Sequence, residues 1–63
     1  MNKVFVIKVD DSFSMEVIKS FHPTIIQEQD NYKYVKIETT TKELLDLKKE
    51  KGFISYMIDL KIG

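Results

Sequence analysis

The segment Thr40–Leu60, TTKELLDLKKEKGFISYMIDL, decides the fold, because a helix signal runs directly into a strand signal there. Thr40 and Glu43 fit a capping box, in which each side chain satisfies the other residue's backbone donor at a helix start. Three leucines follow at helical spacing, and three lysines then complement the negative end of the helix dipole. Gly52 suits a left-handed helix cap. The apolar residues Phe53–Leu60 that follow predict a strand.

The chain before this segment predicts one more helix and three more strands. Residues Lys3–Val9, KVFVIKV, are β-branched and aromatic, as is typical of a strand. Two further strands, Thr24–Gln29 and Tyr32–Glu38, flank Asp30–Asn31, two residue types that tolerate the positive φ of a tight hairpin.

The additional helix is predicted between the first two strands. Phe13, Val17 and Phe21 recur every four residues, which places them on one α-helical face, and candidate N-caps precede them at residues 10–12. Pro23 ends this helix and favours an extended conformation for His22.

This order of elements predicts one α+β domain that spans residues 1–63. With right-handed crossovers, a β-α-β-β-α-β chain forms a four-stranded antiparallel sheet with both helices on one face. Numbered along the chain, the strands take the order 4-1-3-2. This is the ferredoxin-like architecture.

The amino-acid composition limits which classes of partner and which cellular location the sequence predicts. Ten lysines balance ten acidic residues, and the chain has no arginine, which removes the side chain most often used to read phosphates and bases. Nucleic acid is therefore an unlikely partner. No apolar run reaches the length of a membrane span. The absence of cysteine and of a visible signal peptide predicts a cytoplasmic protein.

The sequence lacks a set of residues that predicts catalysis. His22 is the only histidine and has no evident nucleophile and acid beside it, while Asp10 and Asp11 are better explained as helix caps than as cation ligands. Glycine occurs only at positions 52 and 63, so a glycine-rich phosphate loop is excluded. We therefore expect no enzyme activity, no cofactor and no metal.

The strands point to a binding surface, because their alternation places apolar side chains on both faces of the sheet. The helix side is predicted to hold Phe5, Ile7, Val9, Val35, Ile37, Ile54 and Ile58. The opposite side is predicted to hold Val4, Val6, Tyr32, Tyr34, Phe53 and Met57, with Lys8, Lys36 and Ser55 among them. Two short helices cover one face only, and a second apolar face usually marks an interaction site. The alternative is that these apolar residues only raise strand propensity.

Most of the chain resembles the propeptide domain of subtilisin-like proteases, a group that includes stand-alone inhibitors. KVFVIKV resembles the opening strand, SFSMEVIKSF the first helix, and TTKELLDLKKEKGFISYMID the closing helix and strand, with Ile54, Tyr56 and Met57 at its core. The resemblance implies that the sheet face, through Val4, Val6, Tyr32, Tyr34 and Met57, contacts a protease. It also implies a tail, Leu60, Lys61, Ile62 and Gly63, that enters the active-site cleft, although this tail is shorter than the family's.

Three other partner classes stay open. Small phage or bacterial inhibitors of another host enzyme, such as a polymerase or nuclease, have similar size and composition. Residues 4–9, VFVIKV, and 31–37, NYKYVKI, resemble the sheet motifs of RNA-recognition domains, but the glycine of the second motif is missing. A homodimer formed through the second sheet face is the third alternative.

Overall fold

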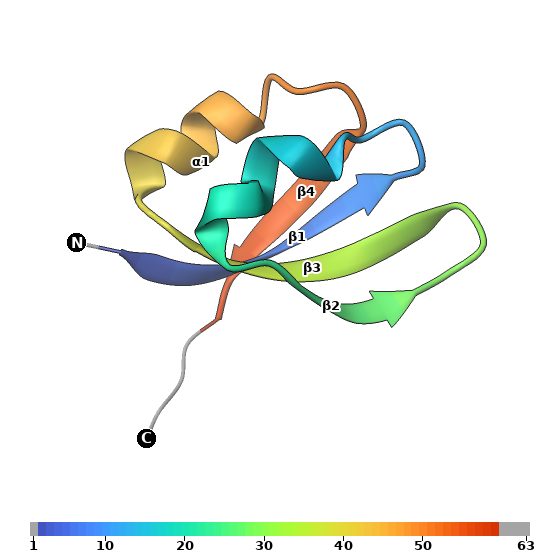
Figure 1. The fold of residues 1–63 in the computed structure, drawn as a ribbon, viewed down its shortest axis with the longest axis horizontal. Coiled ribbons are helices and arrows are strands. Elements are labelled where there is room, and N and C mark those ends of the chain that lie inside the picture. Colours follow the sequence, from blue (N-terminus) through green and yellow to red (C-terminus); the bar gives the residue numbers. More distant parts are fainter. Residues whose placement is uncertain (1, 60–63) are drawn as a thin grey trace.

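Four strands and two short helices follow one another in the computed structural model, which describes residues 2–59 (Figure 1). The strands are β1 (Lys3–Asp10), β2 (Thr24–Glu28), β3 (Tyr32–Thr39) and β4 (Phe53–Ile58), and the helices are η1 (Met15–Phe21) and α1 (Thr41–Leu47). All three strand pairs are antiparallel, and the strand order is β2-β3-β1-β4. This is the predicted order read from the other edge, so the four-stranded antiparallel sheet of an α+β fold is confirmed.

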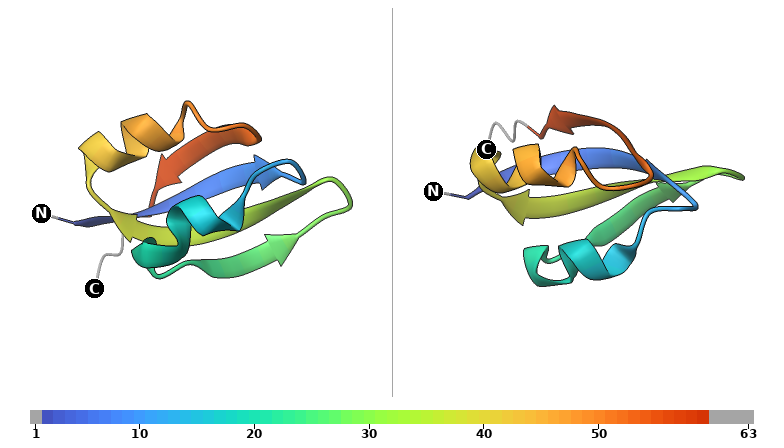
Figure 2. Two further views of the ribbon diagram at one scale, coloured as in Figure 1. Left: turned by 45° about the horizontal axis from the view of Figure 1, so that its top comes forward. Right: turned by 90° about the horizontal axis from the view of Figure 1, so that it is seen from above.

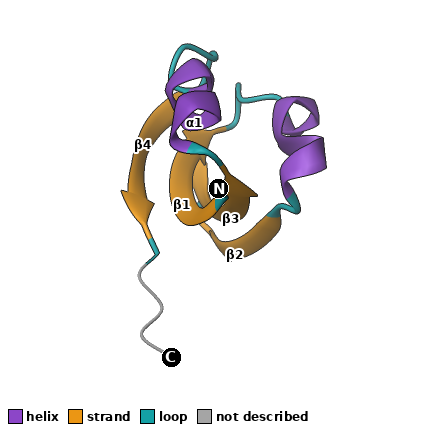
Figure 3. Cartoon of the chain, turned by 90° about the vertical axis from the view of Figure 1, so that its left-hand side faces the viewer, coloured by secondary structure: helices purple, strands orange, loops and turns teal. Residues whose placement is uncertain are grey.

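The hydrophobic core lies between this sheet and the two helices. Opposing residues of β1 and β3 share a face, so Phe5 and Ile7 lie beside Ile37 and Val35 in the core. The buried core residues are Phe5, Ile7, Val9, Phe13, Ile18, Val35, Ile37, Leu44 and Leu47. Because η1 and α1 both contribute to this set, they cover the same face of the sheet (Figure 3).

The first helix differs from the prediction, because η1 is a 3-10 helix and not an α-helix. A 3-10 helix repeats every three residues, so Met15, Ile18 and Phe21 share a side, and Ile18 is the residue buried completely. The helix begins after Ser14, whose side chain makes no capping hydrogen bond. The predicted four-residue spacing therefore found the segment but assigned it the wrong helical period.

His22 ends η1 in the left-handed region, with φ of 53° and ψ of 56°. The extended conformation predicted for this residue before Pro23 is therefore wrong. A left-handed residue is a common way to end a helix, and here it turns the chain into β2. The left-handed end of η1 thus overrides the preference for an extended conformation that Pro23 imposes on the residue before it.

The start of α1 confirms the capping box. The Glu43 backbone N–H donates to Thr40 Oγ1 at 3.1 Å, and Glu43 Oε1 accepts from the Thr40 backbone N–H at 3.5 Å. Thr39 Oγ1 donates to the same carboxylate at 3.0 Å. The helix ends at Leu47, and the lysines that were expected to complement its dipole follow from its C-cap, Lys48, onward.

The predicted Asp30–Asn31 turn joins β2 to β3, and the Gln29 backbone N–H donates to the Tyr32 carbonyl at 2.8 Å across it. Neither turn residue has a positive φ, since His22 is the only non-glycine residue within 2–59 that does. The hairpin was therefore placed correctly, but the backbone conformation of its turn was not.

Candidate protein-binding face

The sheet face opposite the helices is the candidate site, and we call it the open face. Its members follow from the register, because directly opposed residues of antiparallel strands point to the same side. Within residues 2–59, no helix lies over this face (Figure 2). The open face comprises Val4, Val6, Lys8, Asp10, Thr24, Gln27, Tyr32, Tyr34, Lys36, Glu38, Ser55 and Met57.

An aromatic cluster occupies one end of the open face. The Tyr32 and Tyr34 rings meet edge to face, with centroids 5.7 Å apart and planes at 90°. Lys8, opposite Tyr34 on β1, places Nζ 4.2 Å from the Tyr32 centroid and 5.9 Å from that of Tyr34. These distances lie within the cation–π range for both rings.

The other end of the open face is an aliphatic strip bordered by charge. Val6 is opposed by Lys36 on β3 and by Met57 on β4, and Met57 is 62% exposed. The Asp59 backbone N–H donates to the Val4 carbonyl at 2.9 Å, which places Asp59 beside β1. Its carboxylate lies 3.6 Å from Lys36 Nζ, so one ion pair spans β1 from β4 to β3.

The structure brings together most of the predicted binding residues, namely Val4, Val6, Tyr32, Tyr34, Lys36 and Met57. The placement of Phe53 on this face is wrong, because Phe53 opposes Val9 and packs against the core. The β1–β4 register shifts between Lys8 and Val9, and this irregularity leaves Ile54 without a partner. Ile54, predicted on the helix side, is therefore 50% exposed and not part of the core.

The remaining predicted positions are Ile58 and the tail. Ile58 lies in register with Phe5 on the helix side, as predicted, but it is largely exposed because β4 is an edge strand. The predicted tail, Leu60, Lys61, Ile62 and Gly63, lies outside the described residues.

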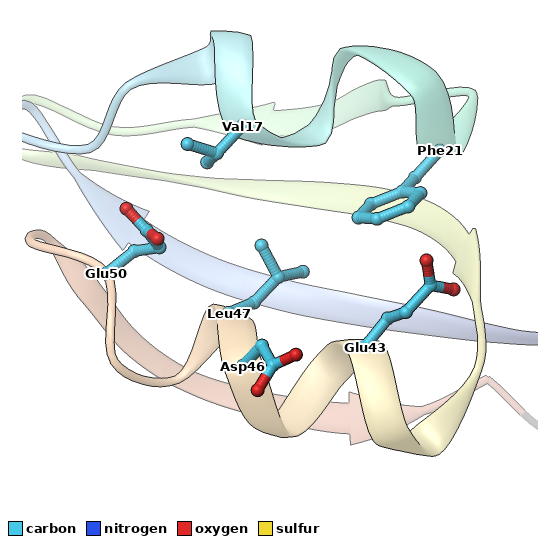
Figure 4. A pocket seen from close by; sticks show the side chains of 6 residues that line it. All are labelled: Val17, Phe21, Glu43, Asp46, Leu47 and Glu50. Carbon is cyan, nitrogen blue, oxygen red and sulfur yellow. The ribbon is translucent and has the colours of Figure 1, made fainter.

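A groove between the two helices was not foreseen from the sequence (Figure 4). Its volume is about 340 Å³, and it is lined by Val17, Phe21, Glu43, Asp46, Leu47 and Glu50. The lining contains three carboxylates but no histidine, lysine or hydroxyl group, and one of the three, Glu43, already caps α1. The spacing of Glu43 and Asp46 on α1 and of Glu50 just beyond it was a visible signal, but nothing in the sequence placed the first helix opposite them.

The perturbed carboxyl groups have structural explanations. Hydrogen bonds from the Ser12 hydroxyl and backbone N–H hold the pKa of Asp10 below its ordinary value. Hydrogen bonds from Thr39 and then Thr40 do the same for the pKa of Glu43. Asp10 thus closes the turn after β1, and Glu43 caps α1. Within residues 2–59, no three His, Cys, Asp or Glu side chains gather closely enough to hold a metal ion.

Comparison with known proteins found no relative of this chain. No family model, no curated protein and no solved structure matches this chain. None of the helices within residues 2–59 has the length and apolar character needed to cross a bilayer. The interpretation of the open face therefore depends on its own geometry.

Proposed function

We propose that this chain is a non-catalytic protein-binding module and that its open face docks on a partner protein. One observation carries the proposal: the central strands present Val6, Tyr32 and Tyr34 on a face that no described helix covers, and Met57 extends the apolar strip onto β4. Tyrosine and methionine are enriched in interface cores, and charged residues are depleted there. The Lys36–Asp59 pair fits the polar rim of such an interface.

We further propose a ferredoxin-like arrangement and, as the partner, a subtilisin-type protease that the domain inhibits or helps to fold. The sheet order and the placement of both helices on one face support the arrangement. The resemblance to protease propeptides supports the partner, because the open face contains all five residues that the resemblance assigns to protease contact. Another bacterial or phage-related enzyme would use the same face, and the cytoplasmic location stays a prediction.

Titration of subtilisin with the purified protein tests the partner. We expect binding to be lost in the double variant Tyr34→Lys/Met57→Lys, because two desolvated ammonium groups would replace two apolar anchors. A single lost anchor costs on the order of 2 kcal/mol, which is about 30-fold in affinity. The matched control is Ile26→Lys/Leu45→Lys, which adds the same charge at two exposed positions outside the open face.

A truncation after Asp59 separates docking from active-site blockade. If the open face docks on the protease and the tail blocks the active site, this variant keeps its affinity for subtilisin but no longer inhibits it. Absence of both binding and inhibition, with folded full-length protein, would contradict the protease as partner. Equal losses in the open-face variant and in its control would contradict the open face as the docking site.

Single-stranded RNA is the second candidate, and the Tyr32, Tyr34 and Lys8 cluster favours it. Aromatic rings on the strands of an open sheet can stack bases, and a neighbouring lysine can contact phosphate. Titration with a labelled single-stranded RNA at two salt concentrations tests this candidate, because phosphate contacts weaken steeply as salt rises.

A further inference from the structure

Strand β4 is an edge of the sheet that carries neither charge nor proline. It pairs with β1 on one side only, and its outer side faces away from the other described elements (Figure 3). Its sequence, FISYMI, contains no charged residue and no proline. Four of its side chains, Ile54, Tyr56, Met57 and Ile58, are 42–62% exposed. Soluble proteins usually protect an edge strand with charges, prolines or bulges that turn it away.

The other edge, β2, has more protection. It carries Gln27 and the charged Glu28, and its pairing with β3 is interrupted at Ile26. An irregularity in an edge strand increases its twist and hinders pairing with a further strand. The pairing of β4 with β1 has a register shift of the same kind at Ile54, so the two edges differ in polarity and charge and not in regularity.

The backbone of β4 indicates what fits this edge. The Asp59 N–H bonds to the Val4 carbonyl, so the even-numbered residues of β1 direct their backbone groups toward β4. Backbone direction alternates along an antiparallel ladder. Ser55 and Met57, which oppose Lys8 and Val6, therefore bond to β1. The N–H and C=O groups of Tyr56 then point outward, as do those of Ile58, and within residues 2–59 no strand pairs with β4 on that outer side.

We propose that two copies of this chain associate by antiparallel pairing of their β4 strands around a two-fold axis at Tyr56. In this register the outward backbone groups of Tyr56 bond to those of Tyr56 of the second copy. Ile54 opposes Ile58 of the second copy, and Ser55 opposes Met57 of the second copy. No charged residue lies within either strand, so the pairing sets no like charges opposite each other.

The asymmetry between the edges favours a closed dimer over an open chain of copies. A two-fold interface uses both β4 edges and leaves the protected β2 edges at the ends of an eight-stranded sheet. Pairing of β4 with β2 of the next copy would let further copies add indefinitely, but it would place the polar Gln27 and the charged Glu28 in the new ladder. The dimer would also present two open faces side by side, and this inference does not depend on what those faces bind.

Sedimentation equilibrium of the full chain over a range of concentrations tests the proposal. We expect a reversible monomer–dimer equilibrium from the 7.4 kDa monomer, with a dissociation constant below about 1 mM. Ile54→Lys should raise this constant at least about tenfold, because it sets a charge opposite an apolar residue. The matched control is Ile26→Lys, since Ile26 is 53% exposed on the opposite edge, and it should leave the constant unchanged. A chain that is still monomeric at about 1 mM, or equal effects of the two variants, would overturn the proposal.

A single introduced cysteine tests the register. The chain has no cysteine, so the cysteine of the Tyr56→Cys variant can form a disulfide only with the same cysteine of a second copy. Directly opposed residues that exchange hydrogen bonds lie about 5.5 Å apart at Cα, within the range that a disulfide spans. Mild oxidation should cross-link Tyr56→Cys faster than Ile26→Cys at equal concentration. Faster cross-linking of Ile26→Cys would show that the copies meet at the other edge. Circular dichroism and thermal melts establish beforehand that each variant is folded.

Discussion

Replacing Gly52 with alanine would test how closely the start of β4 approaches the turn after β1. A Cβ atom at this position would lie 2.6 Å from Asp10 Oδ1, 2.8 Å from Phe13 Cα and closer still to the Phe13 backbone nitrogen. The backbone has little freedom to move away, because the Asp10 N–H donates to the Gly52 carbonyl at 2.8 Å. In addition, Gly52 has a φ of +89°, which favours glycine.

Both effects destabilise the folded state. A positive φ costs alanine roughly 1 kcal/mol relative to glycine. Forcing a methyl group into occupied space costs about 1–3 kcal/mol. The sum is about 2–4 kcal/mol, against a total stability of about 3–9 kcal/mol for a chain of this length. Gly52→Ala should therefore remove a large part of the free energy of unfolding.

Urea denaturation followed by circular dichroism would measure this loss. With a slope of about 1 kcal/mol per molar urea, the midpoint should fall by about 2–4 M. Lys51→Ala is the matched control, because this exposed neighbour should change stability by less than about 0.5 kcal/mol. A loss below about 0.5 kcal/mol for Gly52→Ala would refute the reasoning, since the turn would then yield to the added methyl group.

Three further predictions concern the ends of the helices and their carboxyl groups. Thr40→Ala should cost about 1 kcal/mol of stability by removing the α1 cap, whereas Thr41→Ala should cost less than about 0.5 kcal/mol; equal losses in thermal melts would argue against the cap. His22→Gly should raise stability by about 0.5–1 kcal/mol in urea, because glycine adopts the left-handed region without strain; a loss would contradict that strain. The lowered pKa values of Asp10 and Glu43 mean that these groups stabilise the fold above their unfolded pKa values, so this contribution should be lost as the pH falls below about 4. Urea denaturation between neutral and acidic pH should show a flatter profile for Glu43→Gln than for the wild type, and identical profiles would exclude a role for Glu43.

Local sequence signals determined the central strands and the start of α1. The two-residue alternation from Val4 to Val9 fixed which side chains face the helices, and the register with β3 agrees with it. Thr40 and Glu43 lie three residues apart, so their capping interaction needs no distant contact. Most of the open face was predictable for the same reason, since a strand's two faces follow from its order of residues.

Only the tertiary structure decided the faces of β4, the form of η1 and the conformation of His22. Contacts of Gly52 with the turn at Asp10 and Phe13 fix where β4 begins against β1. The pairing then shifts at Ile54, which moves Phe53 into the core. Such contacts join residues about 40 positions apart, and no window of neighbouring residues contains them. The sequence by itself therefore determined the elements and the open face of the central strands, and the packing between distant segments determined the edges and the ends of the helices.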